Sequence, residues 1–450
     1  MSQEGTFQRL IGVLHQAFES LQLTVEGKRL EEMAVLIHRA MTVQARNYHN
    51  LEHVLGFVDP QNPIQTLAGL FHDIVYYQVD QGFLPEILEI ISPYIQQDNH
   101  TFAIRQAAPD DWQFNLAAEV FGWQRGQEVT LAAGLNEFFS ALVMNERLGG
   151  FVPGQALVKM DLCIEATIPF RGPDRHGKGY FDLLEERLGA INHRWGFGMS
   201  AGDIQETIRL ALSVANKDVE NFAESDAAVF LEYTWKLLPE MNVPLRARNV
   251  YTIREYRGAL QRMEAFFSTV DPEVVFHRYK DVPPESEFRQ MVSRAYHNID
   301  TAWHYLTLKL LTQALLEALA EESGGDAPLS LFMGDLPAES NARRLENFLP
   351  PVTDPPWVDR SSVMLALMES SRKGNLGFYL NTAPLSLFLY RSLRPEEIEQ
   401  ALALSREMFA GRLPPGEFLR RLNPGVVSAV ARASAEMVST RRDQLLRYAQ

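Results

Sequence analysis

The sequence is poor in several features that would assign it to a familiar class of protein. A single cysteine, Cys163, among 450 residues excludes an intramolecular disulfide and fits a reducing compartment. No apolar run approaches the length of a membrane span. The first residues, Met1 to Gly5, lack the basic and apolar regions of a secretory signal. We therefore expect a cytoplasmic protein that does not enter a membrane.

Basic charge is also scarce. The chain has 42 Lys and Arg against 57 Asp and Glu, so its formal net charge is -15 and its pI is near 5.3. Nucleic acids and anionic membranes are bound through basic surfaces, so this composition predicts no nucleic-acid partner. The sequence also lacks the GxxxxGK[ST] loop of P-loop nucleotide triphosphatases and the CxxC pairs of zinc ribbons.

What the chain does have is a helical repeat of apolar residues over most of its length. Amphipathic helices are predicted for residues 7–21 and 28–41. A helix that is more apolar on all sides is predicted for residues 64–77, as expected of a buried central helix. Further helices are predicted from Asp203, as N-cap, to about residue 222, and over residues 285–322. Strand-like alternation is scarce, so we predict an all-α fold.

Proline pairs and chain length indicate more than one domain. A chain of 450 residues exceeds what one compact domain usually holds. Because Pro283-Pro284 precedes the long helix, we expect a first domain over residues 1–284 and a C-terminal helical domain over residues 285–450. Residues 78–150 show no metal-ligand spacing and are expected to be an elaboration of the first domain. The sequence leaves open the role of the C-terminal domain and whether the protein forms homo-oligomers.

The most informative segment is residues 48–53, with the sequence YHNLEH, followed by the pair His72-Asp73. On a helix, His49 and His53 would lie one turn apart on one face. His72 and Asp73 would point about 100° apart. Neutral imidazole binds divalent transition metals, and a carboxylate adds charge and can bridge two ions. These residues need only a distant carboxylate to complete a metal cage.

Together with Asp218-Val219-Glu220-Asn221, these residues resemble the HD superfamily of metal-dependent phosphohydrolases. The HNxxH form with a later D-[LV]-x-N is similar to the cyclic-nucleotide phosphodiesterase branch. The segment from about residue 46 to 77 is also similar to small predicted HD phosphohydrolases of bacteria. The resemblance follows the motif order from about residue 30 to 225 and does not reach the last third of the chain. It implies an HD-domain-like helical bundle with an additional C-terminal helical region.

The resemblance also implies roles for individual residues. His53, His72, Asp73 and Asp218 would be ligands of one or two divalent ions, and Mn, Zn, Ni, Co, Mg and Fe are all compatible with them. His49 would be the general acid that protonates the leaving oxygen. A bound ion would activate water for hydrolysis of a phosphoester, either a nucleotide or another small phosphorylated substrate.

Two assignments within this scheme stay open. Asp161 also follows the HD pair and is the alternative to Asp218, which we prefer because it fits the D-[LV]-x-N pattern near a helix end. Four further residues are weaker candidates for contacting the substrate phosphate, against the simpler interpretation that they face solvent: Lys217, Asn221, Arg171 and Arg175.

Two functional classes also stay open. The first is a metal-dependent phosphohydrolase. The second is a non-catalytic helical binding or regulatory protein whose HD site is degenerate or structural. A minor third alternative, an oxygenase variant of the HD fold, needs further histidine ligands around a di-iron centre, and the sequence does not place them. Metal content discriminates the first two classes, because a catalytic site should bind a divalent ion and keep an open coordination position.

Overall fold

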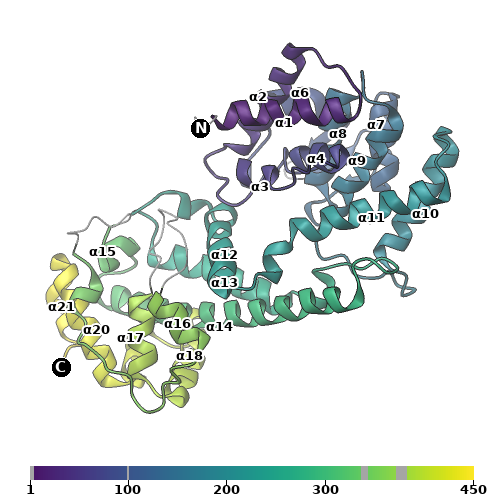
Figure 1. The fold of residues 1–450 in the computed structure, drawn as a ribbon. Helices are drawn as coiled ribbons and strands as arrows, with labels where there is room; N and C mark the ends of the chain where they lie inside the picture. The colour runs from purple at the N-terminus through teal and green to yellow at the C-terminus, as the bar shows by residue number, and fades with distance from the viewer. Residues whose placement is uncertain (1–4, 99–100, 336–342, 371–382) are drawn as a thin grey trace. The chain divides into compact units, whose positions relative to one another are not determined.

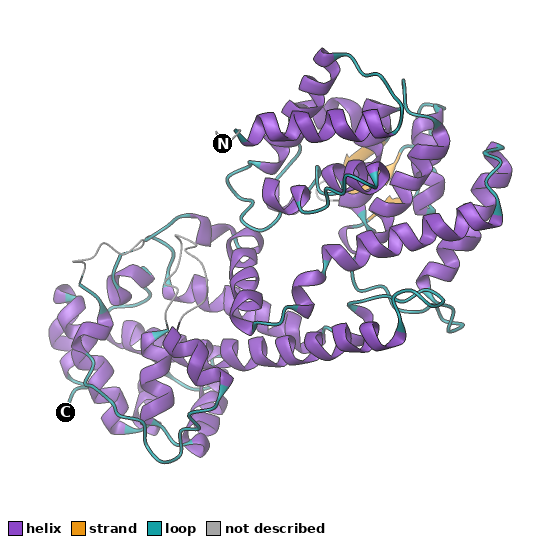
Figure 2. Cartoon of the chain, in the orientation of Figure 1, coloured by secondary structure: helices purple, strands orange, loops and turns teal. Residues whose placement is uncertain are grey.

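The computed structural model describes residues 5–98, 101–335, 343–370 and 383–450. These residues are predominantly helical, consistent with the predicted all-α class (Figure 1). The strands among them are short and form a three-stranded sheet, drawn in orange in Figure 2.

The chain divides into two compact units. Unit 1 comprises Met1–Ala223 and Asp271–Ala295, and unit 2 comprises Glu224–Val270 and Tyr296–Gln450. The sequence-based boundary at residue 284 placed residues 224–270 with the first domain, whereas their contacts group them with the C-terminal unit.

Unit 1 begins with two amphipathic helices whose limits agree with the predicted ones, and it continues through shorter helices around a buried centre. Its helical elements are α1 (Thr6–Ser20), α2 (Gly27–Met41), α3 (Leu51–Leu55), α4 (Pro63–Phe71), α5 (Tyr77–Asp80), α6 (Pro85–Ile91), α7 (Trp112–Phe121), η1 (Leu131–Ala133), α8 (Leu135–Leu148), α9 (Gly154–Ala166), α10 (Tyr180–Trp195), α11 (Ala201–Asp218), η2 (Glu220–Ala223) and η4 (Pro272–Val274).

Helix α9 is the centre of unit 1. Nine of its side chains, from Leu157 to Ala166, are buried, and the helix contacts α4, α7, α8 and α11. Burying an aliphatic side chain of this size contributes about 1.5–3 kcal/mol to stability. Helices α4 and α11 are far apart in the sequence, and both pack on α9. Because α4 and α11 also contact each other, their ends can meet in one place.

The small sheet lies within the predicted elaboration, residues 78–150. Strand β1 (Ile95–Asp98) pairs antiparallel with β2 (Thr101–Ile104), which pairs antiparallel with β3 (Glu128–Val129). Phe102 and Ile104 are buried on alternate positions of β2, the period of two expected for a strand that covers a core. The centroid of the Phe102 ring lies 4.8 Å from that of Tyr77 and 5.6 Å from that of Phe83. The sheet therefore packs beside the segment that follows the HD pair.

Helix α14 (Glu285–Ser323) begins in unit 1 and continues through unit 2, in agreement with the predicted long helix. The remaining elements of unit 2 are α12 (Ala227–Met241), η3 (Val243–Arg246), α13 (Ile253–Thr269), α15 (Leu329–Met333), η5 (Leu345–Phe348), α16 (Val363–Ser370), α17 (Pro384–Ser392), α18 (Pro395–Phe409), α19 (Pro415–Arg421), α20 (Pro424–Met437), η6 (Ser439–Arg441) and α21 (Arg442–Leu446).

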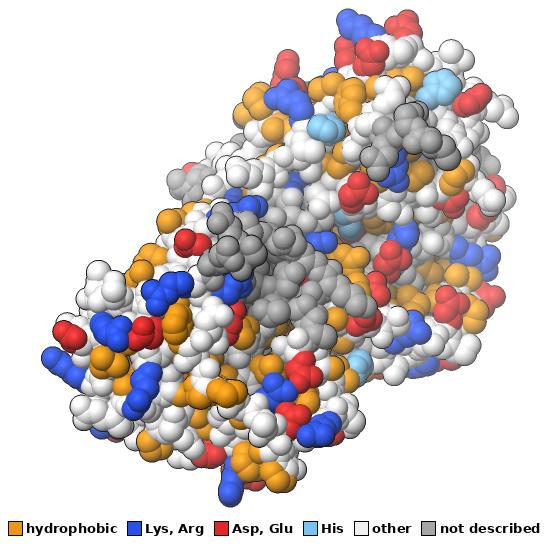
Figure 3. Space-filling model, turned by 60° about the vertical axis from the view of Figure 1, so that its left-hand side comes forward, with side chains coloured by type: hydrophobic (Ala, Val, Ile, Leu, Met, Phe, Trp, Pro, Cys, Tyr) orange, Lys and Arg blue, Asp and Glu red, His pale blue; other side chains and the backbone are white. Residues whose placement is uncertain are grey.

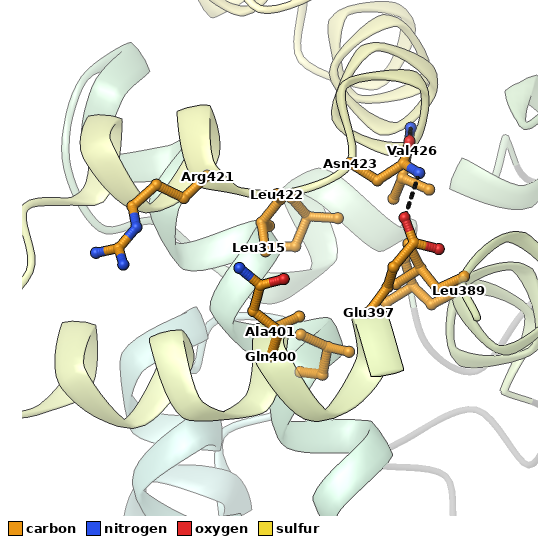
Figure 4. A pocket seen from close by; sticks show the side chains of 11 residues that line it. Leu315, Leu389, Glu397, Gln400, Ala401, Arg421, Leu422, Asn423 and Val426 are labelled. Carbon is orange, nitrogen blue, oxygen red and sulfur yellow. Dashed lines mark hydrogen bonds between the residues drawn. The ribbon is translucent and has the colours of Figure 1, made fainter. Parts of the chain in front are cut away.

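Unit 2 holds a small, largely apolar pocket of about 230 Å³, seen from close by in Figure 4. Its polar side chains include Glu397 and Asn423, and Asn423 Nδ2 donates a hydrogen bond of 2.9 Å to Glu397 Oε1. Leucines from α14 and α17 supply much of the remaining wall: Leu311, Leu315, Leu389 and Leu393. The lining therefore offers packing surface rather than a cluster of reactive groups.

The surface carries charged side chains of both signs. On the face drawn in Figure 3, acidic and basic side chains are interspersed with apolar and uncharged ones. Within the part of the chain that the structure describes, no helix combines the length and apolarity needed to cross a bilayer.

Candidate metal centre

The asparagine of the HNxxH motif shapes the backbone that carries His53. Asn50 is the N-cap of α3, and its Oδ1 accepts hydrogen bonds from the backbone N–H groups of Glu52 at 3.0 Å and His53 at 3.3 Å. Its Nδ2 donates to the Asn47 carbonyl at 2.9 Å. Because α3 starts only at Leu51, the interpretation that His49 and His53 share a helix face is wrong. His49 lies in the bend before the cap.

The HD pair does not lie within a helix either. The predicted helix to residue 77 ends at Phe71, and His72 is the C-cap of α4. His72 Nδ1 lies 2.8 Å from the carbonyl oxygen of Gly69. A carbonyl only accepts, so Nδ1 must carry the proton of this bond, and the other ring nitrogen, Nε2, faces the site. The local backbone thus fixes both the ring orientation and the nitrogen available to a metal ion.

Arg46 fastens the turn that contains Asp73, and it is a residue that sequence reasoning missed. Its side chain is fully buried, and Nη1 donates to the Asp73 carbonyl at 2.6 Å. Nε and Nη2 bind the two carboxylate oxygens of Asp80 at 2.9 and 2.6 Å. Such a bidentate pair sets orientation as well as distance. Its place three residues before His49 is the only signal the sequence offered.

Asp218 reaches the site from the C-terminal end of α11. The helix starts at the N-cap Ser200, and Asp203 is the acidic partner of its capping box rather than the predicted cap. The helix ends at Asp218, short of the predicted residue 222. Near this end, Asn216 Nδ2 donates to the His277 carbonyl at 2.9 Å, and the His277 N–H donates to Asn216 Oδ1 at 2.8 Å. These two bonds tie the helix end to the segment after η4.

Three of the predicted ligands meet at one point. His53 Nε2 and His72 Nε2 are 3.3 Å apart, and Asp218 Oδ1 lies 3.2 Å from the first and 3.3 Å from the second. Ligand atoms about 2.0–2.1 Å from one ion lie about 2.9 Å apart in octahedral and about 3.4 Å apart in tetrahedral geometry. The group His53, His72 and Asp218 has the donor atoms and spacing to hold a metal ion.

Asp73 adds a fourth oxygen beside this group. Its Oδ2 is 3.2 Å from His72 Nε2 and 3.4 Å from His53 Nε2. This oxygen is buried, yet among the described residues it has no hydrogen bond of ordinary geometry. A buried carboxylate oxygen without a partner is costly, and a cation between it and the imidazoles would satisfy it. We read this as the strongest sign that the donor set fits a divalent ion.

The site is partly exposed to solvent, and its charged groups shift one another's pKa values. The side chains of His53, Asp73 and Asp218 are 12%, 17% and 19% exposed, which leaves a face open to solvent. Burial alone would lower the pKa of His53, but Asp218 and Asp73 outweigh it and raise that pKa to about 9. Burial would raise the pKa of Asp218, but His53 and His72 lower it to about 2. Protons and a cation therefore compete for the same imidazole nitrogens and carboxylate oxygens.

The general-acid candidate His49 stands next to the cluster. Its ring centroid is 5.5 Å from that of His53 and 4.7 Å from that of Tyr76, which it meets edge to face. Burial would raise the pKa of Asp73, but the charges of His72 and His49 hold that pKa well below its ordinary value. His49 is thus close enough to act electrostatically on the cluster.

A second residue overlooked in the sequence is Glu137, in the first turn of α8. Burial, together with the negative charges of Asp73 and Asp218, raises the pKa of Glu137 to about 7, although a hydrogen bond from its own backbone N–H and the charge of Arg171 oppose the rise. Its Oε2 is buried and, within the described ranges, accepts no hydrogen bond. No spacing rule links residue 137 to the HD motif, because only the packing of α8 brings it near.

Asp161, the alternative to Asp218, lies elsewhere in unit 1. It is fully buried on α9 and its Oδ2 accepts a hydrogen bond of 2.8 Å from Asn145 Nδ2. It does not belong to the metal-compatible group found among the described residues. Burial raises the pKa of Asp161 well above its ordinary value, with the Asn145 bond opposing the rise.

We expect Asp161→Asn to stabilise the protein at alkaline pH. An acid whose folded pKa is raised contributes stability at low pH that is lost as the pH rises through that pKa. Asparagine has no such loss, and its amide can donate to Asn145 Oδ1, which among the described residues has no donor. The gain at about pH 8 should be about 1 kcal/mol and should shrink towards acid pH. Urea unfolding at both pH values measures it, and a less stable variant at pH 8 would contradict the neutral-acid interpretation.

The four candidate phosphate contacts are mostly engaged in other interactions. Arg171 Nη1 binds Glu165 and Tyr180, both at 2.9 Å. Arg175 is exposed and its Nε donates to His176 at 3.1 Å. Lys217 pairs with Glu220 at 3.3 Å, and Asn221 is half-buried in η2. Lys217 and Asn221 flank Asp218 in the sequence, and the charge of Arg171 lowers the pKa of Glu137.

We expect His277 to make the stability of unit 1 depend on pH. Burial, with the charge of Arg171, lowers the pKa of His277 to about 4. Between the unfolded pKa of about 6.5 and this value, the unfolded chain binds a proton that the folded one does not, so stability falls as pH falls. From pH 7 to 5 we expect His277 to contribute a loss of about 2 kcal/mol, which is read as the difference between the pH slopes of the wild type and of His277→Phe. Urea unfolding tests this, with the exposed His193 replaced by Phe as the control that keeps the wild-type slope.

The segment Gly198-Met199-Ser200-Ala201-Gly202 matches the GxSxG motif of serine hydrolases. In those enzymes the serine stands on a sharp turn between a strand and a helix. Here Ser200 follows the loop after α10, accepts from the Asp203 N–H at 3.1 Å and donates to Asp203 Oδ2 at 2.7 Å. It is a helix cap.

Comparison of the chain with protein-family models, with curated proteins and with solved structures finds no significant match. We therefore infer function from the geometry of the site.

Proposed function

We propose that unit 1 is a metal-dependent phosphohydrolase with an HD-type site, acting on a small phosphoester such as a nucleotide. The observation that carries this proposal is the convergence of His53, His72 and Asp218 on one point, with the unsatisfied oxygen of Asp73 beside them. The four residues come from three separate segments and appear in the order that the HD resemblance implies.

A divalent ion in this site would acidify a water molecule and draw charge from the phosphoryl oxygens. The side chains His53, His72, Asp73 and Asp218 would hold it, and a mixture of imidazole and carboxylate donors suits Mn, Zn, Ni, Co, Fe and Mg to different degrees. His53, His72 and Asp218 would hold one ion, and Asp73 would add a fourth donor or be available to a second ion.

The remaining chemistry falls to residues of the chain itself. His49 stands beside the cluster on the half-buried bend before α3, where an imidazolium can give its proton to the leaving oxygen. The partly exposed side chains of the cluster leave room for a substrate to approach from solvent. Arg46 and Asn50 keep the two motif segments in place without needing to touch substrate.

A metal and substrate screen tests the proposal. The full-length protein is stripped with a chelator and reloaded with Mn, Co, Ni, Zn, Mg or Fe(II), then assayed on nucleoside monophosphates, cyclic nucleotides and aryl phosphates. Tight binding of one equivalent or more together with turnover supports it. Binding without turnover on any phosphoester favours the alternative of a non-catalytic protein with a structural site, and failure to bind metal overturns the metal-centre assignment itself.

A further inference from the structure

Glu137 is attached to the metal-site segment through its neighbours on α8. Asn136 Oδ1 accepts a hydrogen bond of 3.1 Å from the Tyr77 N–H, and Ser140 Oγ accepts one of 3.1 Å from the Val75 N–H. These two bonds fasten the start of α8 to the chain directly after the HD pair. Glu137 lies between the two anchoring residues, so its place relative to the site is fixed by the fold.

One oxygen of the Glu137 carboxyl, Oε2, is buried without a hydrogen-bond partner among the described residues, while the carboxyl accepts a bond from its own backbone N–H. Gly134, with a φ of +92°, precedes α8, and a Cβ at that position would stand 2.1 Å from Ile168 Cδ1 and 3.6 Å from Glu137 Oε2. Ile168 and the positive φ thus exclude a side chain at Gly134, and the glycine lies in ordinary contact distance of Oε2. Oε2 is buried and, among the residues described, has no hydrogen-bond partner. Buried polar atoms in native proteins are almost always satisfied, so an orphan of this kind calls for an unseen partner.

We propose that Glu137 is the proton acceptor of the candidate centre, with the attacking water as the missing partner of its Oε2. The inference rests on the proposed function and adds to it a named base. Three charged groups act on this carboxyl: Asp73 after α4, Asp218 at the end of α11, and Arg171 after α9. The two carboxylates favour protonation of Glu137, and the guanidinium opposes it.

Transfer of a proton to Glu137 accompanies attack of the water on phosphorus. One O–H bond of the attacking water breaks, its proton moves to Glu137 Oε2, and the electron pair left on oxygen forms the new bond to phosphorus. The bond from phosphorus to the leaving oxygen breaks, and that oxygen takes a proton from the His49 imidazolium. Glu137 then returns its proton to solvent and His49 regains one, so both residues end as they began.

The acid strength of Glu137 agrees with this role. In the metal-free protein, burial and the two neighbouring carboxylates raise its pKa to about 7. A general base works best when its pKa is near the operating pH, because it is then deprotonated often enough and still basic enough. An ordinary glutamate would be too weak a base at neutral pH.

The test compares the wild-type protein with Glu137→Gln, which keeps the shape of the side chain. In infrared spectra of the metal-free proteins, the difference between the wild type and Glu137→Gln should show a protonated carboxyl band at about pH 5.5 that fades towards about pH 8.5. In the metal-loaded proteins, kcat/KM of Glu137→Gln should fall about 100-fold at pH 8, and the acid limb of its pH profile should disappear. Asp161→Asn, another buried carboxyl of unit 1, should keep the wild-type profile.

The outcomes separate this inference from the function beneath it. An active wild type whose pH profile survives in Glu137→Gln overturns the role of Glu137 and leaves the proposed hydrolase standing. A Glu137 carboxyl that stays ionised at pH 5.5 overturns it as well. A wild type that binds metal and hydrolyses no phosphoester, even though Glu137 titrates near neutrality, overturns the proposed function and the proton-acceptor role with it.

Discussion

Asp218→Asn should remove metal from the candidate centre while leaving the helices intact. Asp218 Oδ1 lies between the two imidazoles, 3.2 Å from His53 Nε2 and 3.3 Å from His72 Nε2. Asparagine keeps the shape of the side chain and loses the charge that a cation requires. Loss of a residue that merely supports a ligand costs about 10–100-fold in metal affinity, so loss of a ligand should cost at least about 100-fold. Phosphoester hydrolysis should fall in parallel.

Elemental analysis after dialysis and calorimetric titration with the chosen metal measure this effect, and far-ultraviolet circular dichroism checks the fold. Asp161→Asn is the matched control, since it makes the same substitution at another buried aspartate of unit 1, whose side chain is hydrogen-bonded to Asn145. If the Asp161 variant loses metal and the Asp218 variant keeps it, the distal ligand is Asp161 and the convergence around Asp218 is an ion-pair cluster without metal.

The sequence predicted the residues of the cluster better than it predicted the backbone that carries them. Residue type and motif order survive any change in helix limits, so His53, His72, Asp73 and Asp218 could be named together. The limits of the helices could not be predicted in the same way. Ile74 and Val75 continue the apolar pattern of α4 past its end, and periodicity alone therefore extended the helix to residue 77.

The reason that α4 stops is not local. The N–H groups of Val75 and Tyr77 donate to Ser140 and Asn136 on α8, which replaces the helical bonds they would otherwise make. The same packing brings Glu137 towards the cluster, and for the same reason no motif announced it. Arg46 was missed because its role lies in a bond to the Asp73 carbonyl, and backbone acceptors leave no mark on a sequence.

His49→Ala should separate chemistry from metal binding. Its ring lies beside His53, with centroids 5.5 Å apart, but on the bend before α3 and outside the group compatible with a metal ion. The variant should therefore retain its metal. A general acid contributes about 100- to 10,000-fold when the leaving oxygen needs protonation, so turnover of alkyl phosphoesters should fall by that amount.

Aryl phosphates with strongly stabilised leaving groups need little protonation and should be largely spared. The measurement is a series of substrates graded by the pKa of the leaving alcohol or phenol, in which the variant should show a steeper dependence of kcat/KM on that pKa than the wild type. His15→Ala, an exposed histidine on α1, serves as the control and should reproduce the wild-type slope. Loss of metal from the His49 variant would make it a ligand, and an equal loss on all substrates would make it a positioning residue, because only a proton donor distinguishes one leaving group from another.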